Sequence, residues 1–244
     1  MTKAIKSESS HEINIRFYNE HAVKLAEQYD STQFEAVHQA WLPILKKSIR
    51  GSKLVCRILD IGAGSGRDAK FLAQLSTDEN LIQVFAVEPA YSLAKQGKNN
   101  TSKITTKNTL PVTWLNDSLP YLLVTKAVNL KFDLILLSAV WMHIPLGKRS
   151  DSINSLKGLL TPNGKLIITL RHQRGSGSSG DERIMYKVSI EELQALCSNN
   201  ELTVIEHTQL EQDKLGRDQV QWQTVVISHV NNCGSEEQKL FYEQ

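Results

Sequence analysis

Positions 58–68 read ILDIGAGSGRD, and this stretch determines the fold class. An apolar run at 55–61 enters a turn with glycines at 62, 64 and 66, and a helical pattern follows. The order strand, glycine turn, helix is typical of a site where the backbone approaches a ligand closely at the N-terminus of the helix. A dinucleotide fingerprint needs its third glycine at position 67, which is Arg67. The spacing therefore favours a nucleoside ligand over a pyrophosphate.

Composition predicts a soluble globular protein with one large domain. The chain has 244 residues, 41% of them hydrophobic and 22% charged, and a net charge of +2. That balance does not indicate a nucleic-acid binder, although a local basic patch is compatible with it. The three cysteines, Cys56, Cys197 and Cys233, contain no C-x-x-C pair, so we expect neither a disulfide framework nor a metal site.

Targeting signals are not predicted. Residues 1–17 have no apolar segment of the kind found in signal peptides. No apolar run approaches the roughly 18 residues that a membrane helix needs. The interpretation is a cytoplasmic protein with no membrane partner, and the sequence does not predict an oligomeric state.

Strands alternate with helices after an N-terminal helical cap. The cap covers 1–50, with helical patterns at 13–29 and 34–49; it belongs to the same domain as 51–232, and 233–244 form a tail. The expected strands are 55–61, 83–87, 112–115, 132–137, 165–170, 202–206 and 221–228, the last two as a hairpin through 213–218. The expected helices are 67–75, 90–96, 148–160 and 189–197, with 97–109 as a loop or a frayed helix end and 161–164 as a turn. This order predicts an α/β fold: a doubly wound, mostly parallel seven-stranded sheet with helices on both faces.

Ligands of such sheets bind beyond the carboxyl ends of the strands. That rule brings together the glycine turn, Glu88 after the second strand, Asp117 after the third, 138–143 after the fourth and Arg171 after the fifth.

These motifs resemble those of the class I S-adenosylmethionine-dependent methyltransferases, over about 29–170. The glycine motif is 58–66, and the acidic residue Glu88 ends strand two, 22 positions after Gly66. Asp117 follows strand three, FDLILLS occupies 132–138, and LLTPNGK at 159–165 is the turn before strand five. The resemblance implies a methyltransferase with a Rossmann-like fold that uses S-adenosylmethionine and releases S-adenosylhomocysteine.

The resemblance also implies roles for individual residues. Glu88 would accept the ribose hydroxyls, Asp117 the adenine amino group, and Asp60 the ammonium of the methionine tail. The cofactor residues carried over by position are Tyr29, Asp60, Gly62, Ala63, Gly64, Arg67, Asp68, Glu88, Pro89, Asn116, Asp117, Ser118, Leu119, Ser138, Ala139 and Val140. Two alternatives stay open: Arg67 and Asp68 serve as an ion pair of the first helical turn, and Tyr29 is a packed cap tyrosine.

His143, after the central strand, is the candidate general base, because a histidine titrates near neutral pH. The alternative is a structural histidine. Trp141 would contact the sulfonium or the substrate, or fill the core instead. Guanidinium groups after strand five suit a carboxylate or phosphate on the substrate. The candidate substrate residues are Trp141, His143, Arg171, His172, Arg183 and Arg217, with Arg174 and the 175–180 loop nearby.

The favoured function is methyl transfer to oxygen or nitrogen of a small molecule. The first alternative is an RNA- or protein-directed methyltransferase, because 90–116 contain four lysines and no acid. The second is a cofactor-binding subunit without catalysis. A nicotinamide dehydrogenase is disfavoured by Arg67.

Overall fold

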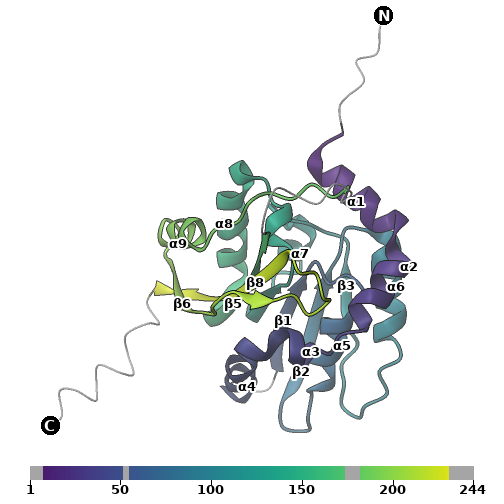
Figure 1. Ribbon diagram of the computed structural model, residues 1–244. Helices are drawn as coiled ribbons and strands as arrows, with labels where there is room; N and C mark the ends of the chain where they lie inside the picture. Colours follow the sequence, from purple (N-terminus) through teal and green to yellow (C-terminus); the bar gives the residue numbers. More distant parts are fainter. Residues whose placement is uncertain (1–7, 52–54, 174–181, 231–244) are drawn as a thin grey trace, which may run out of the picture.

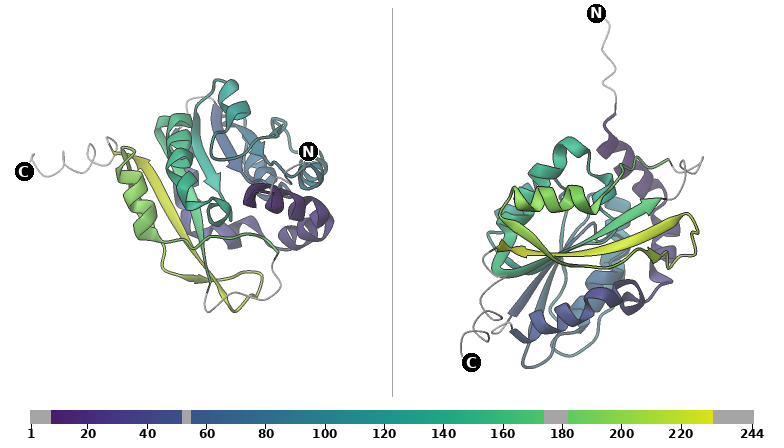
Figure 2. Two further views of the ribbon diagram at one scale, coloured as in Figure 1. Left: turned by 90° about the horizontal axis from the view of Figure 1, so that it is seen from above. Right: turned by 60° about the vertical axis from the view of Figure 1, so that its left-hand side comes forward.

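A computed structural model describes residues 8–51, 55–173 and 182–230 of the chain. Arg174, the 175–180 loop and the tail at 233–244, all named above, lie outside the described residues. Figures 1 and 2 show a central twisted sheet with helices on both sides.

The sheet has the order β3-β2-β1-β4-β5-β8-β6, and the two-residue β7 pairs with β8. The first five strands are parallel, whereas β8 runs antiparallel to both β5 and β6. The strands are β1 (Val55–Ile61), β2 (Leu81–Val87), β3 (Thr113–Leu115), β4 (Phe132–Leu137), β5 (Leu160–Gln173), β6 (Leu202–His207), β7 (Glu211–Gln212) and β8 (Val220–His229). This confirms the doubly wound, mostly parallel sheet; β7 is the one strand added to the predicted seven.

Each face of the sheet is covered by its own helices, because both faces of the central strands are apolar. One core includes Leu59 of β1 and Ile135 of β4, packed against α8 (Arg149–Leu159) and α9 (Ile190–Ser198). The other includes Ile58 and Leu134, packed against α3 (Phe34–His38), α4 (Leu42–Gly51) and α5 (Arg67–Gln74). Alternate residues of one strand therefore serve opposite cores.

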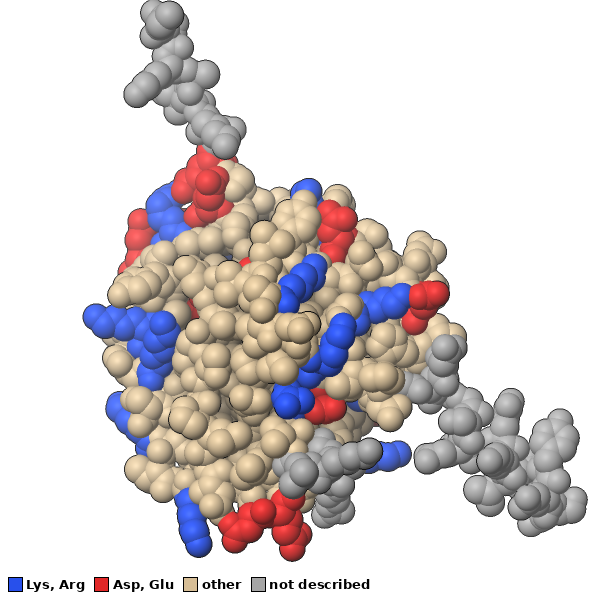
Figure 3. All heavy atoms as spheres, turned by 180° about the vertical axis from the view of Figure 1, so that it is seen from behind, with Lys and Arg blue, Asp and Glu red and all other residues tan. Residues whose placement is uncertain are grey.

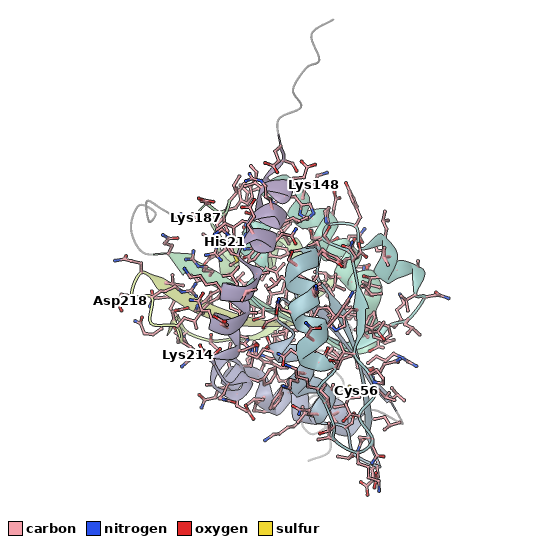
Figure 4. All side chains as sticks on the ribbon, turned by 90° about the vertical axis from the view of Figure 1, so that its right-hand side faces the viewer. His21, Cys56, Lys148, Lys187, Lys214 and Asp218 are labelled. Carbon is pink, nitrogen blue, oxygen red and sulfur yellow. The ribbon has the colours of Figure 1, made fainter. Side chains whose placement is uncertain are left out.

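The cap continues from α4 towards the N-terminus as two helices that lie alongside α6. These are α1 (Ser10–Glu20) and α2 (Ala22–Asp30), interrupted at His21, which lies within the helical pattern predicted at 13–29. A capping box starts α1, because Ser9 and Glu12 bond each other's backbone N–H groups. Figure 4 looks onto this side and shows His21 at the junction of the two helices. An apolar cluster of Ala22, Leu25, Ala26, Ala90 and Leu93 joins α2 to α6.

Helix α6 (Tyr91–Thr101) continues past the predicted end at 96, so the start of 97–109, predicted as a loop or a frayed helix end, is helical. The polar sequence obscured it, and Gly97 resembled a helix stop. Gly97 is instead needed for packing: a Cβ there would lie 2.1 Å from Trp114 Cη2 and 2.9 Å from Gly64 O. The glycine lets α6 approach both β3 and the glycine turn closely.

Other boundaries also differ from the predictions. The predicted turn at 161–164 lies within β5, and the register with β4 is irregular between Phe132 and Leu134. The short helix α7 (Leu123–Ala127) was not predicted. The single-turn 3-10 helices η1 (Gln39–Trp41), η2 (Trp141–His143) and η3 (Leu146–Lys148) interrupt or precede longer elements. Ser189 caps α9 as predicted, with its side chain accepting Glu192 N.

The described residues meet neither the requirements of a membrane helix nor those of a metal site with three or more ligating His, Cys, Asp or Glu side chains. Among the helices of the described chain, none combines the length and apolar character needed to cross a bilayer. Within 8–51, 55–173 and 182–230, no group of three or more His, Cys, Asp and Glu side chains is arranged to hold a metal ion.

The sheet reverses direction of winding at β1, whose neighbours are β2 and β4. In open α/β sheets, a crevice forms outside the carboxyl ends of the strands at this point. The glycine turn follows β1 directly, so the fold places it at the crevice.

Candidate active site

A cavity of about 270 Å³ opens where the cap meets the carboxyl ends of β1, β2, β4 and β5. Its walls come from α1, α2, the glycine turn, the segments after β2, β3, β4 and β5, and the β7–β8 loop. The predicted residues that line it are Tyr29, Asp60, Gly62, Ala63, Gly64, Arg67, Asp68, Glu88, Pro89, Asp117, Ser118, Leu119, Ser138, Ala139, Val140, His143, Arg171, Arg183 and Arg217. Asn116, Trp141 and His172 are not among the lining residues.

The glycine turn after β1 is fixed by hydrogen bonds to the end of β2. Gly62 N donates to Val87 O at 2.8 Å, and Gly64 N donates to Glu88 Oε2 at 3.0 Å. Gly62 has a φ of 71°, and a Cβ there would lie 2.4 Å from Val140 Cγ2. Both the left-handed backbone and the close approach of the post-β4 segment therefore require glycine at this position.

Glu88 is buried under the glycine turn and accepts two backbone N–H groups. Besides Gly64 N, Ala90 N donates to Oε1 at 2.9 Å. Burial raises the pKa of Glu88 to about 7, although the two N–H donors act to lower it. Each carboxylate oxygen has two lone pairs, so Glu88 can accept further donors from a ligand. This is compatible with the predicted contact to ribose hydroxyls.

Asp60, the penultimate residue of β1, is 1% exposed and lines the cavity. Its Oδ2 has no hydrogen-bond partner among the described residues. Burial, and then the nearby Asp68 carboxylate, raise the pKa of Asp60 well above its ordinary value. A buried acceptor without a donor fits a ligand that brings its own donor, such as an ammonium group.

Arg67 and Asp68 form an ion pair, and they also line the cavity. Arg67 Nε lies 2.6 Å from Asp68 Oδ1, and the buried His38 Nε2 lies 2.8 Å from Asp68 Oδ2. Burial alone would raise the pKa of Asp68, but His38 and Arg67 hold it well below its ordinary value. Arg67 Nη1 donates to Thr32 Oγ1 at 2.7 Å. The pair therefore ties the first turn of α5 to the cap.

Tyr29 lies over the glycine turn at the end of α2. A Cβ on Gly64 would lie 3.7 Å from the Tyr29 ring, which is ordinary contact distance. Burial raises the pKa of Tyr29, so its phenol stays protonated. Next to it, Ser65 Oγ donates to Asp30 Oδ1 at 2.7 Å. Tyr29 is thus both a packed cap residue and a lining residue, which joins the two alternatives given above.

Asp117 after β3 holds its own loop. Its Oδ1 accepts Ser118 N at 2.9 Å, and its Oδ2 accepts both the N–H and the hydroxyl of Thr125 at 2.8 Å. These bonds secure α7 and orient the carboxylate at the cavity wall. Asn116 points elsewhere: it is exposed, as expected for the residue preceding Asp117 on an extended segment.

After β4 the chain makes a tight turn. Ala139 has a φ of 58°, unusual for a residue other than glycine, and its N–H donates to Thr169 Oγ1 at 2.8 Å. Trp141 follows in η2 and does not line the cavity, which favours the alternative in which its ring fills the core. The ring is fully buried, with the Arg149 guanidinium carbon 5.6 Å from its centre. The turn directs this large side chain into the core.

His143 lies at the end of η2, between α1 and the segment before α9. Its Nε2 lies 2.9 Å from Tyr18 Oη, and its Nδ1 lies 3.2 Å from Ile184 O and 3.3 Å from Asn14 Nδ2. Asn14 also bonds both backbone groups of Ile184, at 2.9 Å to the carbonyl and 2.8 Å from the N–H. Both ring nitrogens are therefore held, and the imidazole has a fixed orientation in the cavity.

The candidate arginines differ in their contacts. Arg171 and Arg183 both line the cavity, and Arg171 Nη1 lies 3.4 Å from Sδ of Met185, two residues after Arg183. Arg217 also lines it but makes two bonds to Asp213, at 2.9 and 2.6 Å. His172 is the neighbour of Arg171 on β5, and alternation along the strand turns it to the other side.

Sequence reasoning missed Asn14, Tyr18 and His38 as site residues. Asn14 and Tyr18 are four positions apart, so they share one face of α1. A buried asparagine on a helix is a signal in principle, but its burial was not visible before the fold was known. His38 resembled an ordinary cap residue, since its partner Asp68 is 30 positions away.

Comparisons with known proteins agree with the motifs. Residues 59–166 match the model of a family described as a methyltransferase domain. A comparison with curated protein sequences gives no significant match. The structure resembles magnesium protoporphyrin IX methyltransferase from Synechocystis PCC 6803 with bound S-adenosylmethionine, with a TM-score of 0.62 and 12% identity, covering 93% of this chain and 100% of that one.

Two further structures are similar at comparable levels. Phosphoethanolamine N-methyltransferase 2 from Haemonchus contortus, in complex with S-adenosylmethionine, has a TM-score of 0.59 and 16% identity, covering 94% of this chain and 61% of that one. N-methyltransferase NodS from Bradyrhizobium japonicum WM9 has a TM-score of 0.53 and 14% identity, covering 80% of this chain and 98% of that one. The glycine cradle and the unpartnered Asp60 oxygen fit the methionine and ribose portions of this cofactor. Residues 59–166 match a methyltransferase domain, and the chain has the class I, Rossmann-like fold of the S-adenosylmethionine-dependent methyltransferases.

Proposed function

We propose that this enzyme transfers a methyl group to an oxygen or nitrogen of a small-molecule acceptor. One observation carries the proposal: the glycine turn and His143 line the same cavity, with α1 as part of its wall. A cavity with the cap as one of its walls suits a small acceptor that enters whole.

The cofactor would be held by the residues that the motifs predicted. Asp60 would accept the ammonium group, the N–H groups at the start of α5 would receive the carboxylate, Glu88 the ribose hydroxyls and Asp117 the adenine amino group. Bound there, S-adenosylmethionine supplies a methyl group activated by its positively charged sulfur.

The acceptor atom attacks the methyl carbon with its lone pair, the carbon–sulfur bond breaks, and that electron pair stays on sulfur. The acceptor must then lose one proton. Tyr18 and His143 provide a route for it, because the Tyr18 hydroxyl can take the proton while passing its own to His143 Nε2, 2.9 Å away. For this transfer, Nδ1–H would donate to Ile184 O at 3.2 Å, which leaves Nε2 free of hydrogen.

Cap closure contributes positioning and exclusion of water. In-line transfer depends chiefly on alignment of the acceptor atom, methyl carbon and sulfur. Because transfer disperses the sulfonium charge, a site shielded from water also favours it. The bonds from Arg67 to Thr32 and from Ser65 to Asp30 hold the cap against the glycine turn.

An RNA-directed function is less well supported. Lys95, Lys98, Lys103 and Lys107 are exposed, but none lines the cavity. On the described part of the face in Figure 3, lysines and arginines are interspersed with acidic and uncharged residues rather than joined into one basic surface. A cofactor-binding subunit without catalysis would have no need of the His143 and Tyr18 contact.

The test has two stages. Calorimetry with S-adenosylhomocysteine measures cofactor binding, and we expect a single site that is lost or weakened in Glu88→Ala. A screen of metabolites and RNA with radiolabelled methyl donor then identifies the acceptor. Labelling of small molecules is the expected result; labelling of RNA or protein alone would contradict the proposal.

A further inference from the structure

We infer that the acceptor carries a carboxylate or phosphate group, which Arg171 and Arg183 bind beside His143. The inference rests on the proposed function, since it describes the second substrate of the same cavity. It specifies the chemistry of an acceptor that the fold alone leaves open.

The cavity is electrically divided. On the side of the glycine turn, which we call the donor side, the charged lining residues are Asp60, Asp68, Glu88 and Asp117, with Arg67 as the cation. On the side of His143, β5 and the β7–β8 loop, which we call the acceptor side, they are Arg171, Arg183, Lys214 and Arg217, with Glu211 and Asp213 as acids. Among the described lining residues, carboxylates outnumber cations on the donor side and cations outnumber carboxylates on the acceptor side.

This division matches two different substrates. S-adenosylmethionine carries an ammonium and a sulfonium, which acidic residues favour. A cationic acceptor side favours an anion, because complementary charges attract a ligand and reject those of the wrong sign. Methyl acceptors without an anionic group would gain nothing from that side.

Arg183 is the arginine nearest to the proposed proton route. Its Nη1 lies 3.4 Å from Tyr18 Oη, and its guanidinium carbon lies 5.4 and 5.9 Å from the centres of the Phe17 and Tyr18 rings. The next residue, Ile184, is fixed through both backbone groups by Asn14. Arg183 is thereby held where it can bind a group close to the reacting atom.

Arg171, near the end of β5, is the second arginine of the proposed anion site. Its backbone lies opposite Trp222 of β8 in the sheet. Its Nη1 lies 3.0 Å from Gln173 Oε1 and 3.4 Å from Met185 Sδ. Met185 is two residues from Arg183, so the two guanidinium groups come from adjoining segments of one wall. Guanidinium forks bind carboxylate and phosphate oxygens two at a time, which orients the anion as well as attracting it.

Arg217 has a different role, although it lines the same wall. Asp213 accepts its Nε and Nη2, and also the Trp222 indole N–H at 2.6 Å. These donors lower the pKa of Asp213 to about 2, against the effect of burial. Arg217 therefore holds the β7–β8 loop, whose Lys214 and Asp218 are marked in Figure 4. We leave it out of the anion site.

The experiment uses the full chain saturated with S-adenosylhomocysteine. Sodium phosphate in one arm and sodium succinate in the other are titrated against sodium chloride of equal ionic strength, with the thermal unfolding midpoint as readout. We expect a rise beyond that in chloride with at least one anion. Arg171→Gln and Arg183→Gln should each weaken the apparent affinity for that anion about tenfold or more, because each removes charged hydrogen bonds.

Arg16→Gln is the matched control, since Arg16 is an exposed arginine of α1 paired with Glu8 and does not line the cavity. It should leave the anion effect unchanged. Calorimetry with S-adenosylhomocysteine, run on every variant, shows that the donor side is still folded. An anion effect equal to that of chloride, or unchanged in either cavity variant, overturns the inference and leaves the methyltransferase intact. If the unaltered protein did not bind S-adenosylhomocysteine, the proposed function itself would be contradicted.

Discussion

The donor and acceptor sides of the cavity are built by different means. On the donor side, backbone N–H groups and buried carboxylates fix one another, as Glu88 does with Gly64 and Ala90. On the acceptor side, side chains of α1 make the bonds, as Asn14 does with Ile184 and His143. The first arrangement belongs to the sheet core; the second depends on where a cap helix docks.

This difference has an energetic basis. Helix α5 on the donor side buries Ala69, Leu72 and Ala73 against the sheet, whereas the only fully buried residue that the structure describes in α1 is Asn14. Apolar burial stabilises α5 strongly, whereas the apolar side chains of α1 (Ile15, Phe17 and Tyr18) are only partly buried, and hydrogen bonds of about 1 kcal/mol each add to that packing. The donor side should therefore be rigid and the acceptor side easily perturbed.

The largest effect should come from the residue at the boundary of the two sides. In His143→Gln we expect turnover to fall about 10²–10⁴-fold, because a general base contributes that much. The affinity for S-adenosylhomocysteine should stay the same, since the His143 ring is held by Tyr18 and Ile184 rather than by the carboxylates of the donor side. Turnover is measured with the identified acceptor, and the affinity for S-adenosylhomocysteine is measured by calorimetry. Equal losses of turnover and affinity would contradict the distinction between the donor and acceptor sides.

Glu88 should make the stability of the free protein depend on pH. Its pKa is about 7 in the fold against an ordinary 4.5, so the folded state holds its proton more tightly than the unfolded state. The stabilisation is complete below about pH 4.5 and is lost as pH rises through 7; its size is roughly 3 kcal/mol at 1.36 kcal/mol per pKa unit.

Urea unfolding of Glu88→Gln across pH 4–8 measures this contribution. The variant should lose less stability than the unaltered protein as pH rises, and Glu79→Gln, an exposed glutamate, should behave like the unaltered protein. If the free energy of unfolding changed with pH in the same way for Glu88→Gln and the unaltered protein, burial would not raise the pKa of Glu88.

Gly62→Ala tests the rigidity of the donor side. The added Cβ would lie 2.4 Å from Val140 Cγ2 on a backbone with a φ of 71°. Left-handed strain costs about 1–3 kcal/mol, so we expect S-adenosylhomocysteine affinity to fall about 10- to 100-fold. Gly147→Ala, where a Cβ meets nothing within 4 Å, should bind normally. If Gly62→Ala also bound normally, the glycine turn would be more pliable than its contacts indicate.

The two sides also differ in how well the sequence predicts them. Glycine turn, Glu88 and Asp117 lie at strand ends in a fixed order, so short motifs and strand alternation located them. The acceptor side joins Asn14, His143 and Ile184, whose separations of 129 and 170 positions leave no local pattern. Trp141 and His172 do not line the cavity, and the sequence alone could not decide this, because the direction of their side chains depends on one tight turn and on strand register.

Asn14 gives the finest test, because it acts on catalysis through its neighbours. In Asn14→Leu, the two bonds that fix the Ile184 backbone are lost, and Ile184 O is the partner of His143 Nδ1. We expect turnover to fall about tenfold, since net hydrogen bonds are worth about 1 kcal/mol each, with cofactor affinity within twofold. Asn14→Gln, which keeps the amide, should recover part of the turnover.

Asn19→Ala separates positioning from docking of the helix. Asn19 also lies on α1 and also bonds a backbone N–H, that of Ser92 at 2.8 Å, but it does not contact His143. If α1 contributes only as a cover, both variants should reduce turnover equally. If Asn14 orients the imidazole, only its variant should shift the pH profile of turnover, because only there does the ring lose a fixed partner. That outcome would show that one amide of α1 positions the acceptor side.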